Sequence, residues 1–433
     1  MSPGLVALIM FGTLAGLILL RVPVSFALGL ACMPVLIADD RLTPFLLLHA
    51  MFKSYNSFIL LAVPFFVLAA NLMNSAGITS RLVELAKASV GHLPGGLGHI
   101  NVVVSMLFAG ISGPSTAEAA GIGSLLIPAM KKQGYDASFS VAITACASVL
   151  GVIIPPSILM IVWGGLMSVS IGGLFLAGLV PGVLIGLVLM ATVYVFARWR
   201  SYPVYARSTG AEFWRALRRA LLALITPAII VGGIVGGWFT PTEASVVAVI
   251  YAVILGGLVY RTINPKVFSG VLYDSARLAS ISLFCIGTAA AFGWLLAYFR
   301  VPQAIVGMMA GMSVGVTSTG FLVAAAFLFV GMFIDAIPAI MIVGTMLMPL
   351  AQSSGMHPIH FAIIGVISLA FGLVTPPYGL CLLVASTIGE IKLVQALRDV
   401  SLILIPMLLL LVLVILFPEI VLWLPRLIAP KFL

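Results

Sequence analysis

The chain has 433 residues, of which 62% are hydrophobic and only 8% are charged, and its mean hydropathy is +1.27. A soluble domain carries about 25% charged residues, so the composition excludes a soluble protein. It also excludes a globular domain on a single anchor, because no polar stretch is long enough to fold one. The net charge of +9 is expected in cytoplasmic loops and does not indicate nucleic-acid binding.

Long apolar runs recur along the whole chain, which predicts an all-α polytopic membrane protein. In chain order, the predicted segments cover residues 3–20, 24–38, 57–75, 98–130, 136–165 and 172–197, and then 221–238, 243–260, 276–298, 320–350, 358–388 and 400–424. Residues 198–219, between the two sets of six, contain six Arg and one Glu. They are interpreted as a basic cytoplasmic linker between a first half, 1–197, and a second half, 220–433.

The two halves resemble each other when the first is shifted by 221 residues onto the second. Between residues 108 and 159 the first half has ten Gly or Pro, and seven of these recur at the shifted positions. The Pro155-Pro156 pair, for example, falls on Pro376-Pro377. The sequence therefore predicts an internal duplication.

Two of the predicted segments, 98–130 and 320–350, are long but are interrupted by Gly and Pro near their middles. Such interruptions suit the tip of a re-entrant hairpin better than a straight span. If both segments are hairpins, each half crosses the membrane about five times, and an odd number of crossings makes the two repeats inverted.

The distribution of basic residues tests this topology. With the 198–219 linker inside and both termini outside, 16 Lys and Arg lie inside and 5 outside, which accounts for all 21. This agrees with the positive-inside rule. A count of twelve ordinary spans would instead place Lys131-Lys132 outside, so the charges favour the hairpins.

Each predicted hairpin tip is followed by a double proline inside an apolar segment. A Pro-Pro pair removes two backbone donors and frees upstream carbonyl groups. In transporters, unwound helices use such carbonyls to bind cations, while helix N-termini face anionic groups. We therefore expect Na⁺ and an anionic substrate to bind near the membrane midplane, with the hydroxyl groups of Ser112 and Thr375 among the cation ligands. Helix packing and kinks are the alternative use of the Gly and Pro residues.

Three acidic residues lie in apolar surroundings, where a carboxylate indicates a functional site. Asp335 belongs to the second hairpin tip, and we expect it to line the substrate site. Glu118 and Glu243 each follow a Ser/Thr-containing turn, so that helix capping and a functional role are both open for them. The four cysteines are separated and apolar in context, and we interpret them as core residues.

Several motifs resemble the large membrane subunit of TRAP transporters over nearly the whole chain. They are Gly91-His-Leu-Pro-Gly-Gly-Leu-Gly98, Ile111-Ser-Gly-Pro-Ser-Thr-Ala-Glu-Ala-Ala-Gly-Ile-Gly123, Ile154-Pro-Pro-Ser157, Gly236-Gly-Trp-Phe-Thr-Pro-Thr-Glu-Ala244 and Thr375-Pro-Pro377. Two residues depart from the family pattern: Pro114 stands where Ser is more frequent, and Asn71 where Gly is more frequent.

The resemblance implies a Na⁺-driven importer of the bacterial inner membrane with an elevator-type fold. A periplasmic substrate-binding protein (P-type) would deliver a small organic anion, of the dicarboxylate, sugar-acid or sialic-acid class. A small four-helix membrane subunit (Q-type) would brace the scaffold within the lipid bilayer. Both termini would be periplasmic. No enzyme activity or organic cofactor is implied, and two or more Na⁺ ions would be used per cycle.

By similarity, the first sodium site is expected at Ala109, Ser112, Gly151, Ile154 and Pro155. The second is expected at Gly331, Gly372, Thr375 and Tyr378. Position alone places the substrate near Ser115, Thr116 and Asp335. The alternative is a stand-alone ion-coupled carrier of related inverted-repeat fold, which would transport without a binding protein. A membrane enzyme is disfavoured because no catalytic cluster is found in the sequence.

Overall fold

The computed structural model describes residues 1–110, 114–309 and 315–432, and within these ranges the chain is helical and contains no strand. Ser112 of the predicted first sodium site lies outside the described residues. The first half forms α1 (Pro3–Leu19), α2 (Val24–Ala31), α3 (Met33–Ala38), α4 (Pro44–Tyr55), η1 (Phe58–Leu61), α5 (Ala62–Ser75), α6 (Ile78–Val90), α7 (Gly96–Ala109), α8 (Ser115–Lys132), α9 (Ala137–Ser148), α10 (Leu150–Ile153), α11 (Ile158–Met167) and α12 (Ile171–Arg200).

The second half begins with α13 (Gly210–Val235), α14 (Pro241–Val253), η2 (Ile254–Val259), α15 (Pro265–Tyr298), α16 (Val301–Met309) and α17 (Val316–Gly331). It continues with α18 (Ala336–Ala339), η3 (Ile340–Gly344), α19 (Thr345–Ser353), α20 (Pro358–Gly372), α21 (Leu380–Gly389), α22 (Leu393–Leu416), α23 (Glu419–Ile428) and η4 (Pro430–Phe432). The elements α18, η3 and α19 follow one another without a break and form one helix, Ala336–Ser353.

Seven helices of the described chain are long and apolar enough to cross a membrane, and a bent pair, Ala137–Ile153 with Ile158–Met167, brings the number to eight. The remaining apolar helices are shorter, and α7, α17, α20 and α21 are among them. A helix of 20 residues spans about 30 Å, so these shorter helices have to combine in pairs or end inside the bilayer. The structure is thus that of a polytopic helical membrane protein.

The local sequence explains where several helices begin. Proline occupies the first turn of α4, α14, α15 and α20, where its missing N–H is not needed. At α13 and α14, Thr and Glu three residues apart form a capping box. The box at α14 uses Thr240 and the exposed Glu243, so capping is the structural role of this acid.

Much of the predicted linker, 198–219, is helical. Arg198 and Arg200 belong to the last turn of α12, and residues 210–219 form the charged first part of α13, so only residues 201–209 are non-helical. The charges in 210–219 concealed the start of α13, because polar and apolar residues are interspersed there and give no continuous apolar run.

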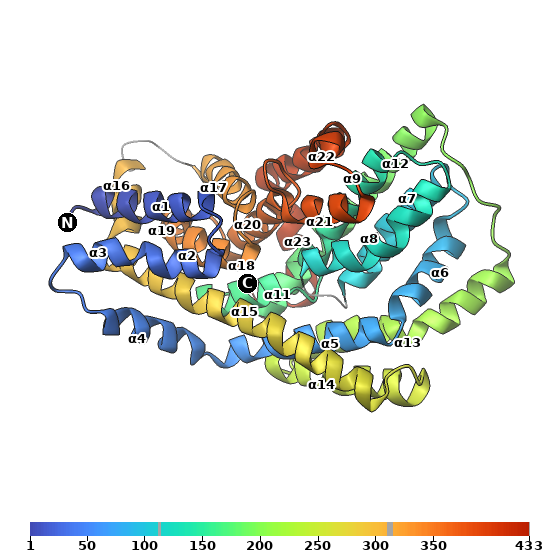
Figure 1. Cartoon of the computed structure of the whole chain (residues 1–433), viewed down its shortest axis with the longest axis horizontal. Helices are drawn as coiled ribbons and strands as arrows, with labels where there is room; N and C mark the ends of the chain where they lie inside the picture. The colour runs from blue at the N-terminus through green and yellow to red at the C-terminus, as the bar shows by residue number, and fades with distance from the viewer. Residues whose placement is uncertain (111–113, 310–314, 433) are drawn as a thin grey trace.

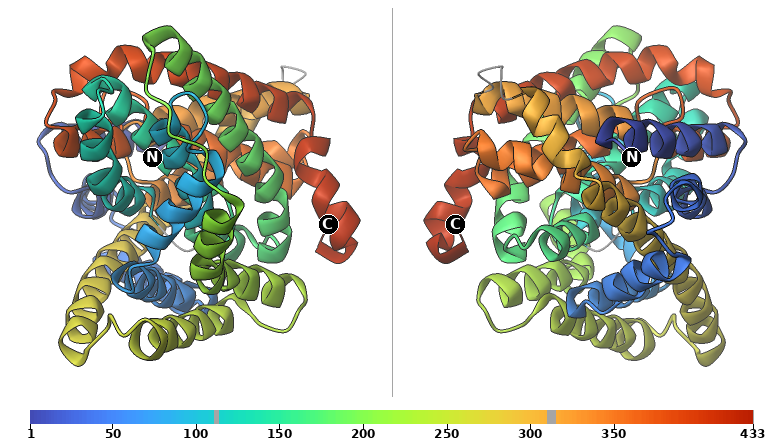
Figure 2. Two further views of the ribbon diagram at one scale, coloured as in Figure 1. Left: turned by 90° about the vertical axis from the view of Figure 1, so that its right-hand side faces the viewer. Right: turned by 90° about the vertical axis from the view of Figure 1, so that its left-hand side faces the viewer.

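Apart from α1, α2, α3 and α16, the helices form two groups (Figures 1 and 2). The first group, which we call the outer layer, consists of α4, α5, α6, α13, α14 and α15, and its members pack on one another in the lower part of Figure 1. The second group, which we call the hairpin body, consists of α7 to α12 and α17 to α23. The 34-residue helix α15 runs along the boundary and packs against α4, α5 and η3.

The helix boundaries in the hairpin body match at the 221-residue offset. Residues 115–132 form α8, the helix after the first hairpin tip, and residues 336–353 form the helix after the second hairpin tip. Likewise α9 begins at 137 and α20 at 358. In Figure 1 α7 and α8 lie in the right half of the molecule, and α17 and α19 lie in the left half.

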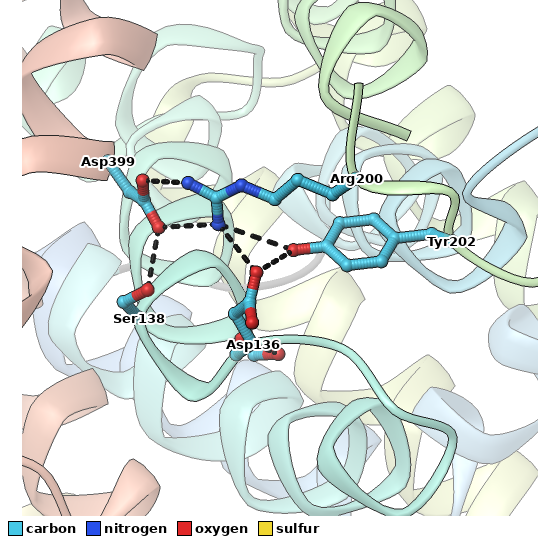
Figure 3. A network of polar contacts seen from close by, with 6 residues as sticks. Asp136, Ser138, Arg200, Tyr202 and Asp399 are labelled. Carbon is cyan, nitrogen blue, oxygen red and sulfur yellow. Dashed lines mark hydrogen bonds and ion pairs between the residues drawn. The ribbon is translucent and has the colours of Figure 1, made fainter. Parts of the chain in front are cut away.

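A polar network joins the two halves at the end of α12 (Figure 3). Arg200 donates hydrogen bonds to Asp399 on α22 at 3.0 Å and to Asp136, before α9, at 2.9 Å. Ser138 also donates to Asp399. Burial raises the pKa of Tyr202, and the protonated phenol donates to Asp136 at 2.8 Å. The network fixes the start of the linker to the hairpin body.

Candidate substrate and cation site

A cavity of about 360 Å³ lies between the outer layer and the hairpin body. Val63 and Val67 on α5, together with Leu278, Ile281 and Ser282 on α15, form the wall on the side of the outer layer. The opposite wall is formed by both hairpin tips and by residues beside both Pro-Pro pairs. These residues are Pro114, Ser115, Thr116, Ala117, Val152, Ile158, Leu159, Asp335, Ala336, Ile337 and Leu373. Residues separated by more than 200 positions in the sequence therefore meet at one site.

Three helices begin at this cavity, because the first turns of α8, α11 and Ala336–Ser353 all contribute lining residues. The first backbone N–H groups of a helix have no partner within the helix, and the helix dipole gives this end a partial positive charge. Ser157 accepts one such bond from Met160, and Asp335 accepts another from Ala336. The remaining donors make this wall favourable for an anionic group.

The three residues predicted to bind substrate all lie at this cavity. Ser115 is buried with its hydroxyl group at the start of α8, Thr116 is half-buried, and Asp335 exposes its side chain to the cavity. No Lys, Arg or His is among the described lining residues, so helix N-termini and hydroxyl groups are the positive or donating groups that this wall offers. Their roles in binding remain predictions.

The first predicted sodium site surrounds the end of α7 and the break between α10 and α11. Ala109 ends α7 and is fully buried, and the backbone around Gly151, Ile154 and Pro155 is buried as well. A Cβ on Gly110 would lie 3.6 Å from the carbonyl oxygen of Pro155, which shows how closely the tip approaches the break. The structure thus brings the four described members of this site together.

The break itself is short. Residues 154–157 leave the helical conformation, and the flanking helices meet at an angle of 42°. Ser157 restores one hydrogen bond because its hydroxyl group donates to the carbonyl oxygen of Val152 at 2.6 Å. The Pro155-Pro156 bond is cis, as is Pro376-Pro377.

The residues predicted for the second sodium site lie where α17 meets the break after α20. A Cβ on Gly372 would lie 2.7 Å from Gly331 Cα, so the two backbones are in direct contact. Thr375 donates its hydroxyl hydrogen to Phe371 O at 2.6 Å, which leaves the oxygen lone pairs available to a cation. Tyr378 is 47% exposed and its ring lies beside Phe333, so its contribution to a cation site would come from the backbone.

The two residues that depart from the family pattern, Pro114 and Asn71, lie in different surroundings. Pro114 lines the cavity, whereas Asn71 does not and instead donates a hydrogen bond to Ser275 across the α5–α15 contact at 2.9 Å.

Glu118 is fully buried in the first turn of α8. Its position is one turn from Ser115, and Cys381 on α21 lies close to both.

Sequence reasoning did not identify the wall formed by α5 and α15. Val63, Val67, Leu278 and Ile281 are ordinary residues of apolar spans, and Ser282 is one serine among several in α15. No spacing or residue type distinguished them, because what brings them to the site is the packing of the outer layer on the tips.

Comparisons with known proteins agree with this architecture. Residues 11–420 match the family described as "Tripartite ATP-independent periplasmic transporter, DctM component". The sialic acid TRAP transporter large permease protein SiaM of Vibrio cholerae is 36% identical over 96% of this chain and 97% of its own length. The C4-dicarboxylate TRAP transporter large permease protein DctM of Pseudomonas aeruginosa is also 36% identical, over 87% of this chain and 88% of its own length.

Among solved structures, the YdaH transporter of Alcanivorax borkumensis superposes with a TM-score of 0.55 at 16% sequence identity, over 82% of this chain and 85% of that one. This likeness concerns the fold. The family match covers almost the whole chain, and the two relatives cover nearly all of it at the same identity. The chain therefore belongs to the DctM family, the large permease component of tripartite ATP-independent periplasmic transporters.

Proposed function

We propose that this chain imports a small organic anion together with Na⁺, as the large membrane subunit of a tripartite transporter. The substrate is a carboxylate-bearing solute of the dicarboxylate, sugar-acid or sialic-acid class. The two relatives described above are named for sialic acid and for C4-dicarboxylates at equal identity, so that identity does not favour one of these solutes.

The observation that carries the proposal is the single cavity at which both hairpin tips and both Pro-Pro breaks meet the outer layer. Three helix N-termini line it, which favours a bound carboxylate. Ser115, Thr116 and Asp335 supply hydroxyl and carboxylate groups for the rest of the solute. The mostly apolar side of α5 and α15 excludes water around it.

The two sodium sites flank this cavity in the proposal. Ala109, Ser112, Gly151, Ile154 and Pro155 form the first, and Gly331, Gly372, Thr375 and Tyr378 form the second. Most of these residues would act through backbone carbonyl oxygens, which are suitable ligands for a hard cation. The close contacts of Gly110 with Pro155 and of Gly331 with Gly372 support this grouping. Na⁺ bound beside the tips would also offset the negative charge of Asp335.

Transport is proposed to follow an elevator mechanism, in which the hairpin body moves against the outer layer and carries the cavity with it. The two inverted repeats, 1–197 and 220–433, supply one hairpin each, and the basic residues of 198–219 lie on the cytoplasmic side. The matching helix boundaries at the 221-residue offset support the repeat, and the positions of the two hairpins in opposite halves of the molecule agree with its inversion.

Two protein partners complete the proposal. A periplasmic substrate-binding protein (P-type) delivers the solute, and a small four-helix membrane subunit (Q-type) braces the scaffold in the bacterial inner membrane. Both termini face the periplasm in this topology. The family description names a tripartite periplasmic transporter, which supports two partners without identifying them.

The proposal is tested by uptake of a labelled organic acid into proteoliposomes that contain both membrane subunits. The external buffer contains Na⁺ or, as the control, choline, and the matching binding protein is present or omitted. Uptake that requires both Na⁺ and the binding protein is the expected result. Uptake with Na⁺ alone would favour a stand-alone carrier, and uptake in choline would contradict the sodium sites.

A further inference from the structure

The outer layer carries a concentrated patch of positive charge at the start of α13. Three adjoining hollows share Arg219 as a lining residue, and together they are lined by six cationic side chains on α6, the linker and α13. These are Arg81, Lys87, Arg207, Arg215, Arg218 and Arg219. Two acids, Glu84 and Glu212, lie among them, which leaves a net charge of +4. We call this set the arginine pocket.

The two acids are already engaged. Glu84 pairs with Arg219 at 3.3 Å, and Glu212 accepts the backbone N–H of Thr209 in the capping box at 2.8 Å. Arg215, Arg218 and Arg219 are exposed and stand three and four positions apart on one helix, where like charges repel. The positive-inside rule accounts for the side of the membrane on which these residues lie. It does not account for their convergence on one hollow surface.

The surroundings of the arginine pocket are those of a membrane interface. Trp214 is 53% exposed and lies under Arg218, with the guanidinium carbon 5.9 Å from the ring centroid. Phe213 and Leu221 are exposed on the same helix. Only 33% of the apolar stretch of α13 is buried, the lowest share among the seven long helices of the described chain. Exposed aromatic rings beside basic residues are typical of the headgroup level of a bilayer.

We propose that the arginine pocket binds the headgroup of an anionic phospholipid. The phosphate contacts Arg215 and Arg218, and the acyl chains lie along the exposed apolar side of α13. Arginine suits this role because its planar guanidinium binds phosphate with two parallel hydrogen bonds. Basic pockets between transmembrane helices on the cytoplasmic side are suited to such lipids.

The test measures lipid retention by the purified full chain in neutral detergent. The probes are phosphatidylglycerol, phosphatidylcholine and glycerol phosphate, and bound lipid is counted by native mass spectrometry. Phosphatidylglycerol should be retained well above the other two probes. The double variant Arg215→Gln/Arg218→Gln should reduce its apparent affinity about tenfold or more.

The matched control is Arg277→Gln/Arg398→Gln. It removes two exposed arginines that are predicted on the same side of the membrane and lie outside the pocket lining. This control should retain phosphatidylglycerol like the parent chain. An equal loss in both double variants would overturn the proposal in favour of general charge attraction. If phosphatidylcholine were retained as well as phosphatidylglycerol, the proposal would be overturned in favour of non-selective lipid contact. If glycerol phosphate were retained as well as phosphatidylglycerol, it would be overturned in favour of a site for soluble phosphates. The unfolding midpoint of each variant separates weaker binding from loss of fold.

Discussion

The two hairpin tips use the same backbone arrangement but place different chemistry at the cavity. The first tip meets a break of four buried residues, 154–157, and contributes the hydroxyl groups of Ser115 and Thr116. The second meets a longer break, 373–379, part of which is exposed, and contributes the carboxylate of Asp335. Two similar helix arrangements thus yield an asymmetric cavity, in which the second tip alone supplies a charged side chain among the described lining residues.

The tips also differ in what they touch. A Cβ on Gly110 would meet the ring of Pro227 on α13 at 2.7 Å, so the first tip packs on the outer layer. Gly331 instead meets Gly372 of its own hairpin body. The glycine of the first tip therefore packs on a helix of the outer layer, whereas the glycine of the second tip packs on the break in its own group.

The largest expected effect comes from separating the second tip from its break. A Cβ introduced by Gly372→Ala would lie 2.7 Å from Gly331 Cα and 2.8 Å from Leu328 O, and neither backbone atom can rotate away. Overpacking of this kind costs about 1–3 kcal/mol, and we expect uptake to fall by up to about a hundredfold. The control is Gly121→Ala, which has open space at its Cβ position. Uptake near the parent rate in Gly372→Ala would show that the contact is not required.

Next in size is the effect of removing the charge at the second tip. Asp335→Asn keeps an N-cap for the helix at Ala336, because Asn caps as well as Asp. Loss of a charged hydrogen-bonding partner costs about 1.5–3 kcal/mol, so that uptake should fall about tenfold with little change in stability. The exposed Asp274 supplies the control Asp274→Asn. If uptake were unchanged at all solute concentrations, Asp335 would not contact solute or cation.

A smaller effect is expected at the hydroxyl group of the second break. Thr375→Val removes a proposed Na⁺ ligand and should raise the Na⁺ concentration for half-maximal uptake about fivefold, since a hydrogen-bonding group contributes about 1 kcal/mol. Thr375→Ser should restore it. Thr387 is a close match for a control, because its hydroxyl group also donates to the carbonyl four residues earlier but is exposed. The same shift in Thr387→Val would assign the effect to helix stability.

The smallest effect on transport is expected at Asn71, which lies on α5 but does not line the cavity. Asn71→Ala removes the hydrogen bond to Ser275 and should lower the free energy of unfolding by about 1 kcal/mol. Uptake and the preference between two organic acids should stay unchanged, because Asn71 does not line the cavity. The double variant with Ser275→Ala should be no less stable than the sum of the single changes predicts. A changed preference between the two organic acids would mean that the contact between α5 and α15 affects the shape of the cavity.

Sequence patterns predicted that segments 98–130 and 320–350 are interrupted, because Gly and Pro limit the backbone directly. The structure has a break within each segment, and the helices that follow these breaks, 115–132 and 336–353, begin and end at equivalent positions. The sequence left two roles open for Glu243, helix capping and a functional site. The structure shows the capping bond, which Glu243 accepts from the backbone N–H of Thr240.

Other parts of the molecule left no such pattern. The helix α4, Pro44–Tyr55, is too short for a hydropathy signal, and the charged start of α13 resembled a loop. The α5 and α15 side of the cavity depends on how distant apolar helices pack, which a single sequence does not encode locally. The Gly and Pro residues that break the helices were therefore easier to predict from the sequence than the apolar residues of α5 and α15 that line the cavity.

The network around Arg200 has a consequence for how such a chain can evolve. At the 221-residue offset, Asp136 corresponds to His357, Arg200 to Val421 and Asp399 to Gly178. Two identical half-length chains would have to carry the same residue at both equivalent positions, and so could not build this contact on one side only. A single chain that contains both halves can carry different residues at equivalent positions, as it does at these three pairs. The Arg200 network depends on this difference, because the residues at the equivalent positions cannot form the same ion pairs.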